Sequence, residues 1–430
     1  MSNSLTVLLG AGSTMDTGNP GYPKGMFSTE QLTNELTKEQ LPAFIDSGAM
    51  YVPKPDPGSP IEFPARSFPP YLFQIPIIPF IYRSLRAHYS YVDFELILHA
   101  VEQLLTYSNT VRFFKSTDPL RHVLASFVEI QTQHKLLNDP MILTRTHKQL
   151  IESIMSQINN RIYMLGNLER ASQGLKSLLS PLKEPFKLKV FTLNYDDIID
   201  FAFPEGVDGF TDGGGSLPHL SFNPALFLNA SRSESHLLVH LHGSVRYGYA
   251  NFPEKIGKYK SSQEAYDLIK RTSRSSANDT KNGEYFGDDP IISGLHKVSK
   301  LIHNPQPFGY YYQAFTDAIL NSHRLLVIGY GARDEHINTW LQEFKKVHQD
   351  KRRVLWVSKV SGERIGEVSD YEMSLLRMLA GGNREFNESQ IVLEPQNHFQ
   401  EHGPNLRLIP TGFPFSDSSL SERILEFLGS

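Results

Sequence analysis

Short apolar runs that end in glycine or polar residues recur along this chain. The first run, Leu5–Leu9, passes directly into Gly10-Ala-Gly-Ser13. The later runs are Leu188–Leu193, Leu237–Leu241, Leu325–Ile328 and Val354–Val357. Such runs are typical of buried parallel strands, and Asp334–His348 has the spacing of an amphipathic helix. Strands that alternate with helices predict an α/β fold built on a Rossmann-like parallel sheet.

The apolar positions change to helical spacing between residues 92 and 180. Phe94, Ile97 and Val101 are one example, and glycine and proline are scarce in this stretch. We therefore expect a large helical insertion of roughly 90 residues in the sheet domain.

A proline-rich segment precedes the helical stretch. Residues 52–80 carry nine prolines, a density that excludes a helix or a central strand. The patterns predict a Rossmann-like domain of residues 1–35 and 185–430, and an insertion of residues 36–184 that holds the proline-rich arm and the helices. The polar residues 250–290 are expected to form a surface insertion.

Composition narrows the possible functions. The 430 residues include 42 Lys and Arg against 46 Asp and Glu, a net charge of −4, so we expect no direct nucleic-acid binding. Cysteine is absent, which excludes disulfides, cysteine-held zinc, iron–sulfur clusters and a thiol nucleophile. No apolar run is long enough to span a membrane and no signal peptide is visible, so we expect a cytoplasmic protein with no membrane partner.

Polar residues cluster where the predicted strands end, which is where open parallel sheets bind ligands. The first cluster is Gly10, Ala11, Gly12 and Ser13. Glycines allow backbone N–H groups to approach a pyrophosphate. The cluster lacks the third glycine and the later acid of the full dinucleotide fingerprint, so a tight turn alone is an equal alternative.

The second and third clusters carry candidate catalytic groups. Asn194 precedes Asp196 and Asp197, one of which could cap the following helix, whereas an asparagine has no such structural reason on an apolar strand. His240 and His242 are two residues apart. We expect one to be a core histidine and His242, beside a glycine, to transfer protons. No further metal ligands are evident, so we expect no metal site.

The fourth cluster runs from Gly329 and Tyr330 to His336. Arg333 could pair with a phosphate, and Asp334 could cap the next helix or bind a ribose hydroxyl. Ser358 ends the following strand.

Taken in order, these four clusters resemble the sirtuin family. The Gly10–Ser13 run is similar to the sirtuin phosphate loop, and Asn194-Tyr-Asp196 to the Asn-Ile-Asp signature. His242-Gly243 is similar to the catalytic His-Gly, and Gly329-Tyr330 stands where sirtuins have a Gly-Thr-Ser turn. The longer strings around these motifs are most similar to the bacterial sirtuin-like NAD hydrolases of anti-phage defence.

The resemblance implies that NAD is the substrate, without a metal, and that the products are nicotinamide and ADP-ribose. It implies that Asn194 positions the ribose and the attacking water, that His242 is the general base and that Asp196 binds the nicotinamide carboxamide. The implied binding residues are Gly10, Ala11, Gly12 and Ser13 for the pyrophosphate, and Gly329, Tyr330 and Ser358 for the adenosine side.

Two departures separate the chain from deacylating sirtuins. It has no cysteines for their zinc ribbon, and the gap between Asn194 and His242 is longer. An NAD-dependent protein deacylase and a non-catalytic NAD or ADP-ribose sensor are the alternatives. By size, the chain is most similar to the defence subunit that works with a HerA-family hexameric ATPase. Argonaute-associated and sensor-bearing relatives are further alternatives. We also expect a homo-oligomer.

Overall fold

The structure of this chain is a computed structural model that describes residues 3–14, 26, 32–33, 36, 81–82, 85–89, 92–113, 140–166, 168–212, 219–233, 235–249, 256–265, 280–281, 284–285, 290–293, 297, 300–301, 305–358, 370–381, 399–410, 413 and 420–429. The chain divides into two compact units. Unit 1 comprises Met1–Ser28, Ile158–Ala265 and Leu301–Ser430, and unit 2 comprises Thr29–Gln157 and Tyr266–Lys300. The proline-rich segment 52–80 lies outside the described residues.

Unit 1 contains a seven-stranded sheet in the order β12-β13-β11-β10-β1-β2-β5. Its strands are β1 (Ser4–Leu9), β2 (Lys187–Thr192), β5 (Leu237–His240), β10 (Arg324–Ile328), β11 (Arg353–Val357), β12 (Gln400–Glu401) and β13 (Leu406–Ile409). All neighbours pair in parallel except β12, which runs antiparallel to β13. Counted along the chain, the parallel strands have the 3-2-1-4-5-6 order of dinucleotide-binding folds. The predicted Rossmann-like α/β sheet is confirmed.

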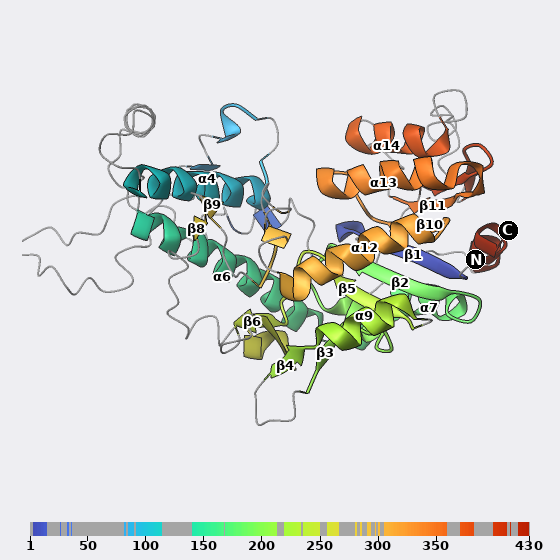
Figure 1. Cartoon of the computed structure of the whole chain (residues 1–430), viewed down its shortest axis with the longest axis horizontal. Helices are drawn as coiled ribbons and strands as arrows, with labels where there is room; N and C mark the ends of the chain where they lie inside the picture. Colours follow the sequence, from blue (N-terminus) through green and yellow to red (C-terminus); the bar gives the residue numbers. More distant parts are fainter. Residues whose placement is uncertain are drawn as a thin grey trace, which may run out of the picture. The chain divides into compact units, whose positions relative to one another are not determined.

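Helices accompany the sheet (Figure 1). Its parallel strands are almost entirely buried, whereas Glu401 of β12 is exposed. The helices of unit 1 include α7 (Leu168–Leu182), α8 (Ile198–Ala202), α9 (Pro224–Arg232), α12 (Tyr310–Asn321), α13 (Glu335–His348), α14 (Asp370–Ala380) and α16 (Leu420–Gly429). Strands that are covered on both faces read as nearly continuous apolar runs, which explains the pattern along the chain. Each of the predicted strands is present, with its ends within one residue of the prediction.

A second, four-stranded antiparallel sheet in unit 1 was not predicted. It has the order β3-β4-β7-β6, with β3 (Phe210–Thr211), β4 (His219–Phe222), β6 (Tyr247–Tyr249) and β7 (Ile256–Tyr259). Every residue of β7 is buried, Lys258 included. The expectation of a surface insertion over residues 250–290 is therefore wrong for Ile256–Tyr259.

Unit 2 holds helices and a two-stranded sheet. Its elements are α4 (Phe94–Phe113), the part of α6 (Pro140–Leu165) up to Gln157, and the pair β8 (Thr280–Lys281) and β9 (Glu284–Tyr285). Buried Glu102 contacts the Nζ of Lys300 and, at 3.2 Å, the Nε2 of His147. Burial would raise the pKa of Glu102, but Lys300 and His147 lower it to about 2. In the described part of the chain, no helix is both long and apolar enough to cross a bilayer.

The turns that follow β1 and β10 touch backbone to backbone. The N–H of Gly10 donates to the carbonyl of Ile328 at 2.9 Å, and the N–H of Gly12 donates to the carbonyl of Gly329 at 3.0 Å. A Cβ at Gly10 would lie 2.5 Å from the Gly329 oxygen. Packing against the facing turn is therefore enough to require glycines in the first turn, whether or not a ligand binds there.

Gly329→Ala is expected to lower the free energy of unfolding of unit 1 by about 3 kcal/mol. Gly329 has a φ of +63°, and a Cβ there would lie 2.4 Å from the backbone of Gly12. Gly331→Ala is the matched control, because a Cβ there meets nothing within 4 Å. Denaturant titration followed by tryptophan fluorescence measures both variants. If the Gly329→Ala and Gly331→Ala proteins had equal free energies of unfolding, the close contact between Gly329 and Gly12 would be contradicted.

Candidate active site

The candidate site lies at the carboxyl edge of the central strands. β1 stands between β10 and β2, and the chain order of the strands reverses there. This is the switch point at which open α/β sheets bind ligands. The segments that follow β1, β2, β5 and β10 all reach this edge, and they carry the sequence-predicted clusters.

Asn194 is held by the turn that follows β1. Its Nδ2 donates to the Oγ of Ser13 at 3.1 Å and to the Oγ1 of Thr14 at 3.0 Å, and the residue is buried. The Ser13 hydroxyl in turn donates to the carbonyl of Gly10 at 2.7 Å. Both amide protons of Asn194 are thus committed within the protein. The carbonyl Oδ1 is the atom through which this side chain can act on a ligand, as an acceptor from a hydroxyl group or water.

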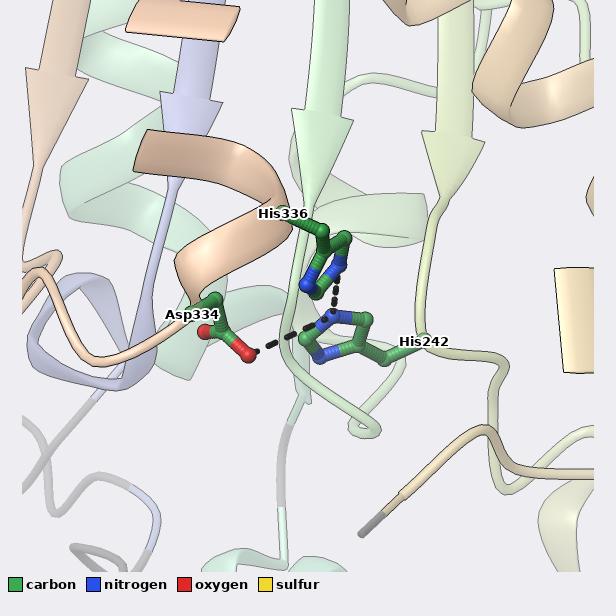
Figure 2. A group of neighbouring side chains, drawn as sticks. All are labelled: His242, Asp334 and His336. Carbon is green, nitrogen blue, oxygen red and sulfur yellow. Dashed lines mark hydrogen bonds and ion pairs between the residues drawn. The ribbon is translucent and has the colours of Figure 1, made fainter. Parts of the chain in front are cut away.

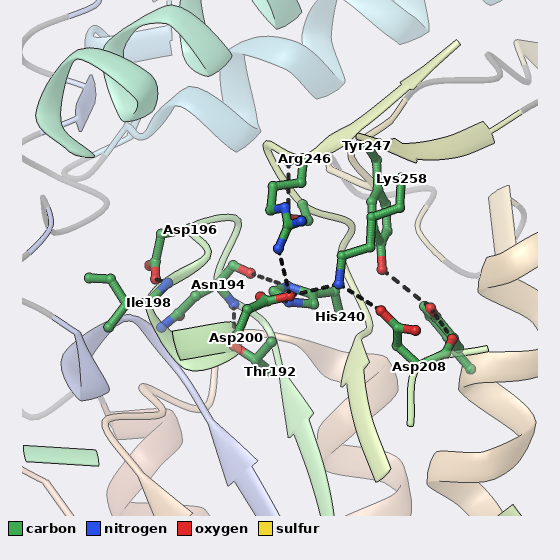
Figure 3. Close-up of polar contacts among 12 residues, drawn as sticks. Thr192, Asn194, Asp196, Ile198, Asp200, Asp208, His240, Arg246, Tyr247 and Lys258 are labelled. Atoms are coloured by element: carbon green, nitrogen blue, oxygen red, sulfur yellow. Dashed lines mark hydrogen bonds and ion pairs between the residues drawn. The ribbon is translucent and has the colours of Figure 1, made fainter. Parts of the chain in front are cut away.

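Asp196 joins the same network. Its Oδ2 accepts from the Thr14 hydroxyl at 2.9 Å, and its Oδ1 accepts from the N–H of Ile198 at 3.1 Å, as Figure 3 shows for the second bond. The bond to Ile198 satisfies a donor at the start of α8, so the capping role predicted for one of the two acids belongs to Asp196. Burial raises the pKa of Asp196.

Asp197 occupies the N-cap position of α8 but makes no capping bond with its side chain. It is buried, and its Oδ1 has no hydrogen-bond partner among the described residues. Burial, together with the charges of Asp200 and Asp196, raises the pKa of Asp197 to about 7. This carboxyl is therefore mostly protonated in the folded protein at pH values below about 7.

Asp197→Asn is expected to make unit 1 more stable than the wild type at pH 8, by on the order of 4 kcal/mol. The folded-state pKa of about 7 lies above the ordinary value of 3.8. The wild type therefore loses stability as pH rises through this interval, whereas the amide does not titrate. Denaturant titrations at pH 4 and pH 8 measure the difference, with exposed Asp317→Asn as control. An unchanged pH dependence in Asp197→Asn would refute the shift.

Buried charged side chains lie beside the segment that follows β2, which contains Asn194 (Figure 3). His240 is fully buried. Its Nε2 lies 2.8 Å from the Oδ2 of Asp200, and its Nδ1 lies 3.4 Å from the carbonyl oxygen of Asn194. Lys258 binds Asp200 at 2.7 Å and Asp208 at 2.6 Å. Although burial opposes ionisation, Lys258 and His240 hold the pKa of Asp200 well below its usual range. His240 is thus the core histidine that the sequence predicted.

His242 faces two residues of the segment that follows β10. Its Nε2 lies 3.4 Å from the Nε2 of His336 and 3.8 Å from the Oδ1 of Asp334. Figure 2 shows the three side chains directed at one another. Their ligand atoms all lie within 4.8 Å of each other. The expectation that His242 lacks neighbouring metal ligands is therefore wrong.

Most of the remaining residues that were predicted to bind NAD already make hydrogen bonds within the protein. The N–H groups of Gly10, Gly12, Ser13 and Thr14 all donate to backbone carbonyls, so these four are committed within the protein. The Tyr330 hydroxyl is likewise engaged, with the Asp334 carbonyl at 3.1 Å and the Asn338 Oδ1 at 2.8 Å. Half-buried Ser358 directly follows β11, and its side chain bonds Glu372. Arg333 is exposed.

A family model described as a SIR2-like domain matches residues 188–375. The match includes Asn194, His242 and Gly329, while the glycine turn of residues 10–13 lies outside it. SIR2-like domains bind NAD as a substrate, so the match supports the sirtuin-like resemblance and fits an NAD-related activity. No curated protein matches the chain.

Proposed function

We propose that this chain hydrolyses NAD at the bond between nicotinamide and ribose and releases nicotinamide and ADP-ribose. The observation that carries the proposal is the position of Asn194. Its amide is locked by Ser13 and Thr14 at the switch point of a dinucleotide-type sheet, within a segment that matches a SIR2-like domain. Because both amide protons of Asn194 are bonded within the protein, its Oδ1 is held in a fixed position and can accept a hydrogen bond from a ligand.

The chemistry needs little more than positioning and charge stabilisation. Nicotinamide leaves as a neutral molecule from a cationic pyridinium, so the ribose becomes oxocarbenium-like in the transition state. A buried acceptor can orient a ribose hydroxyl or the attacking water. Holding the reacting groups in place lowers the entropic part of the barrier. We assign this role to Asn194 Oδ1.

His242 is assigned the role of general base. It is buried at the same edge of the sheet, and its ring lies 6.4 Å from that of Tyr195, the residue after Asn194. A neutral imidazole accepts a proton near neutral pH, and the nearby Asp334 carboxylate stabilises the imidazolium that forms. Asp196 is assigned to the nicotinamide carboxamide. Thr14 and Ile198 already orient its carboxylate.

Incubation with NAD tests the proposal. We expect nicotinamide and ADP-ribose in equal amounts, without any acylated peptide. Release that requires an acyl-lysine peptide and yields an acylated ribose would instead identify a deacylase. Saturable binding of NAD with no nicotinamide release under any condition would identify a sensor. The absence of cysteine argues against the deacylase, because the zinc ribbon of that class cannot form here.

We further propose that the chain is a cytoplasmic homo-oligomer larger than a dimer, which acts in anti-phage defence with a HerA-family ATPase. An unrestrained NAD hydrolase would harm its own cell, so its turnover must be controlled, and assembly with a partner is one means of control. Light scattering measures the mass, and turnover with and without the ATPase measures the coupling. A fully active monomer would contradict both the oligomer and the ATPase partner. An oligomer whose turnover does not change when the ATPase is added would contradict the partner alone.

A further inference from the structure

We infer that His242, Asp334 and His336 form a binding site for a divalent transition-metal ion, with zinc as the best match, and that the bound ion restrains NAD cleavage. The restraint rests on the proposed role of His242, whereas the binding itself does not. The three residues come from two separate parts of the sheet edge: His242 follows β5, and the other two begin α13.

The spacing of the ligand atoms fits a small coordination sphere. In tetrahedral zinc sites with bonds of about 2.0–2.1 Å, the ligand atoms lie about 3.3 Å apart. The two Nε2 atoms are 3.4 Å apart, and the Asp334 Oδ1 lies 3.8 Å from the Nε2 of His242. Small side-chain rotations would bring all three atoms to bonding distance.

The chemical types of the three ligands also indicate which metal ions would bind here. Two imidazoles and one carboxylate suit zinc and neighbouring first-row ions, whereas magnesium and calcium prefer oxygen ligands alone. Three protein ligands are the number found in zinc sites that keep a position for water or substrate. A direct hydrogen bond between the two imidazoles is the competing explanation for their approach, and it predicts no metal affinity.

The surrounding residues hold the ligands in place. Asp334 stands at the N-cap position of α13 but makes no capping bond, and its carboxylate points toward His242 (Figure 2). Its carbonyl oxygen accepts from the Tyr330 hydroxyl at 3.1 Å. The carbonyl of His336 accepts from the Tyr312 hydroxyl, which in turn accepts from the indole N–H of Trp340 at 2.8 Å. These contacts hold the backbone from which the side chains of Asp334 and His336 project.

A metal at this site would act on the proposed base directly. An imidazole that is bonded to a metal through Nε2 can no longer accept a proton at that atom. Zinc bound here would therefore lower turnover, and a chelator would raise it. The site would then restrain NAD cleavage until the metal is removed or displaced.

Cobalt titration of the full chain tests the site without reference to NAD. After EDTA treatment and removal of the chelator, we expect one equivalent of Co²⁺ to give visible d–d absorption, and Zn²⁺ to displace it. His336→Gln should weaken Co²⁺ binding at least about 100-fold, since ligand loss exceeds the effect of losing an outer partner. His88→Gln is the matched control, because His88 is exposed and belongs to unit 2.

Turnover measurements test the restraint. We expect one equivalent of Zn²⁺ to suppress nicotinamide release by the wild type at least about 10-fold, with recovery after EDTA. Whatever activity His336→Gln retains should be insensitive to the same zinc concentration. Asp334→Asn provides a second variant if His336→Gln does not fold, as judged by tryptophan fluorescence.

The outcomes separate the two claims. No cobalt absorption, or equal absorption in the wild type and both ligand variants, would overturn the site. Stoichiometric zinc without loss of turnover would overturn the restraint. If the metal-free chain releases no nicotinamide under any condition, the proposed hydrolase activity and the restraint fail together, while the cobalt spectrum still decides whether the site exists.

Discussion

Asn194→Ala is expected to lower nicotinamide release about 10²–10⁴-fold under conditions in which the wild type turns over NAD. Alanine removes the Oδ1 acceptor that the bonds to Ser13 and Thr14 hold in place. The Ser13 hydroxyl keeps its bond to Gly10, and the Thr14 hydroxyl keeps its bond to Asp196. The turn after β1 should therefore stay formed, and the loss should appear in turnover far more than in NAD affinity.

Asn321→Ala is the matched control for this variant. Asn321 is exposed at the end of α12, and its amide donates to the carbonyl of Asp317 at 2.7 Å. We expect wild-type turnover from it. Turnover, NAD affinity and thermal unfolding should be measured for both variants. Near-wild-type nicotinamide release from a folded Asn194→Ala protein would show that this residue does not position the reaction.

Lys258→Met is expected to lower the free energy of unfolding of unit 1 by about 3–5 kcal/mol. The ammonium of Lys258 lies between the carboxylates of Asp200 and Asp208, at 2.7 and 2.6 Å. Methionine fills a similar volume but leaves both carboxylates facing each other without this cation. The two charges then repel in a poorly solvated site, which is the costly way to break a buried ion pair.

Tryptophan fluorescence is a selective probe of this loss, because both tryptophans, Trp340 and Trp356, belong to unit 1. Lys346→Met is the control: Lys346 pairs with Glu343 on the exposed side of α13, where a pair contributes about 0–1 kcal/mol. Changing Asp200 and Asp208 to asparagine in the Lys258→Met background should recover part of the stability. Equal destabilisation by the two lysine variants would show that the buried network contributes little.

The sequence predicted the parallel sheet because short, nearly continuous apolar runs are typical of strands that are buried on both faces. The strands are buried on both faces and are followed at once by glycine or polar residues, so both their type and their ends were visible in the pattern. Their polar ends also identified Asn194 and His242 as candidates. The structure brings Asn194 to the turn after β1, as expected for residues at one edge of a parallel sheet.

The small antiparallel sheet was missed for a physical reason. Its strands are two to four residues long, too short to show alternation, and Lys258 has the appearance of a surface residue. What makes Lys258 a core residue is the pair of acids, Asp200 and Asp208, which lie 58 and 50 residues away in the chain. Local patterns contain no information about such distant charge pairs.

The meeting of His242 with Asp334 and His336 was hidden for the same reason. The histidines are 94 residues apart, and only the return of the chain through β10 brings them together. The signal that could have found them is the polar run after β10, Arg333-Asp-Glu-His336, at a strand end on the same sheet edge as His242. In that run the sequence alone suggests a role only for Arg333 and Asp334.

The glycine contact between the turns after β1 and β10 also limits how this sequence can evolve. At Gly10, Gly12 and Gly329, a methyl group would collide with the backbone of the facing turn, so no smaller partner residue can make room for it. Substitution at one of these positions would force apart the ends of β1 and β10 and displace the turn that holds Ser13. Lineages that retain the site should therefore retain all three glycines as a set, whereas lineages that lose the site become free to replace them.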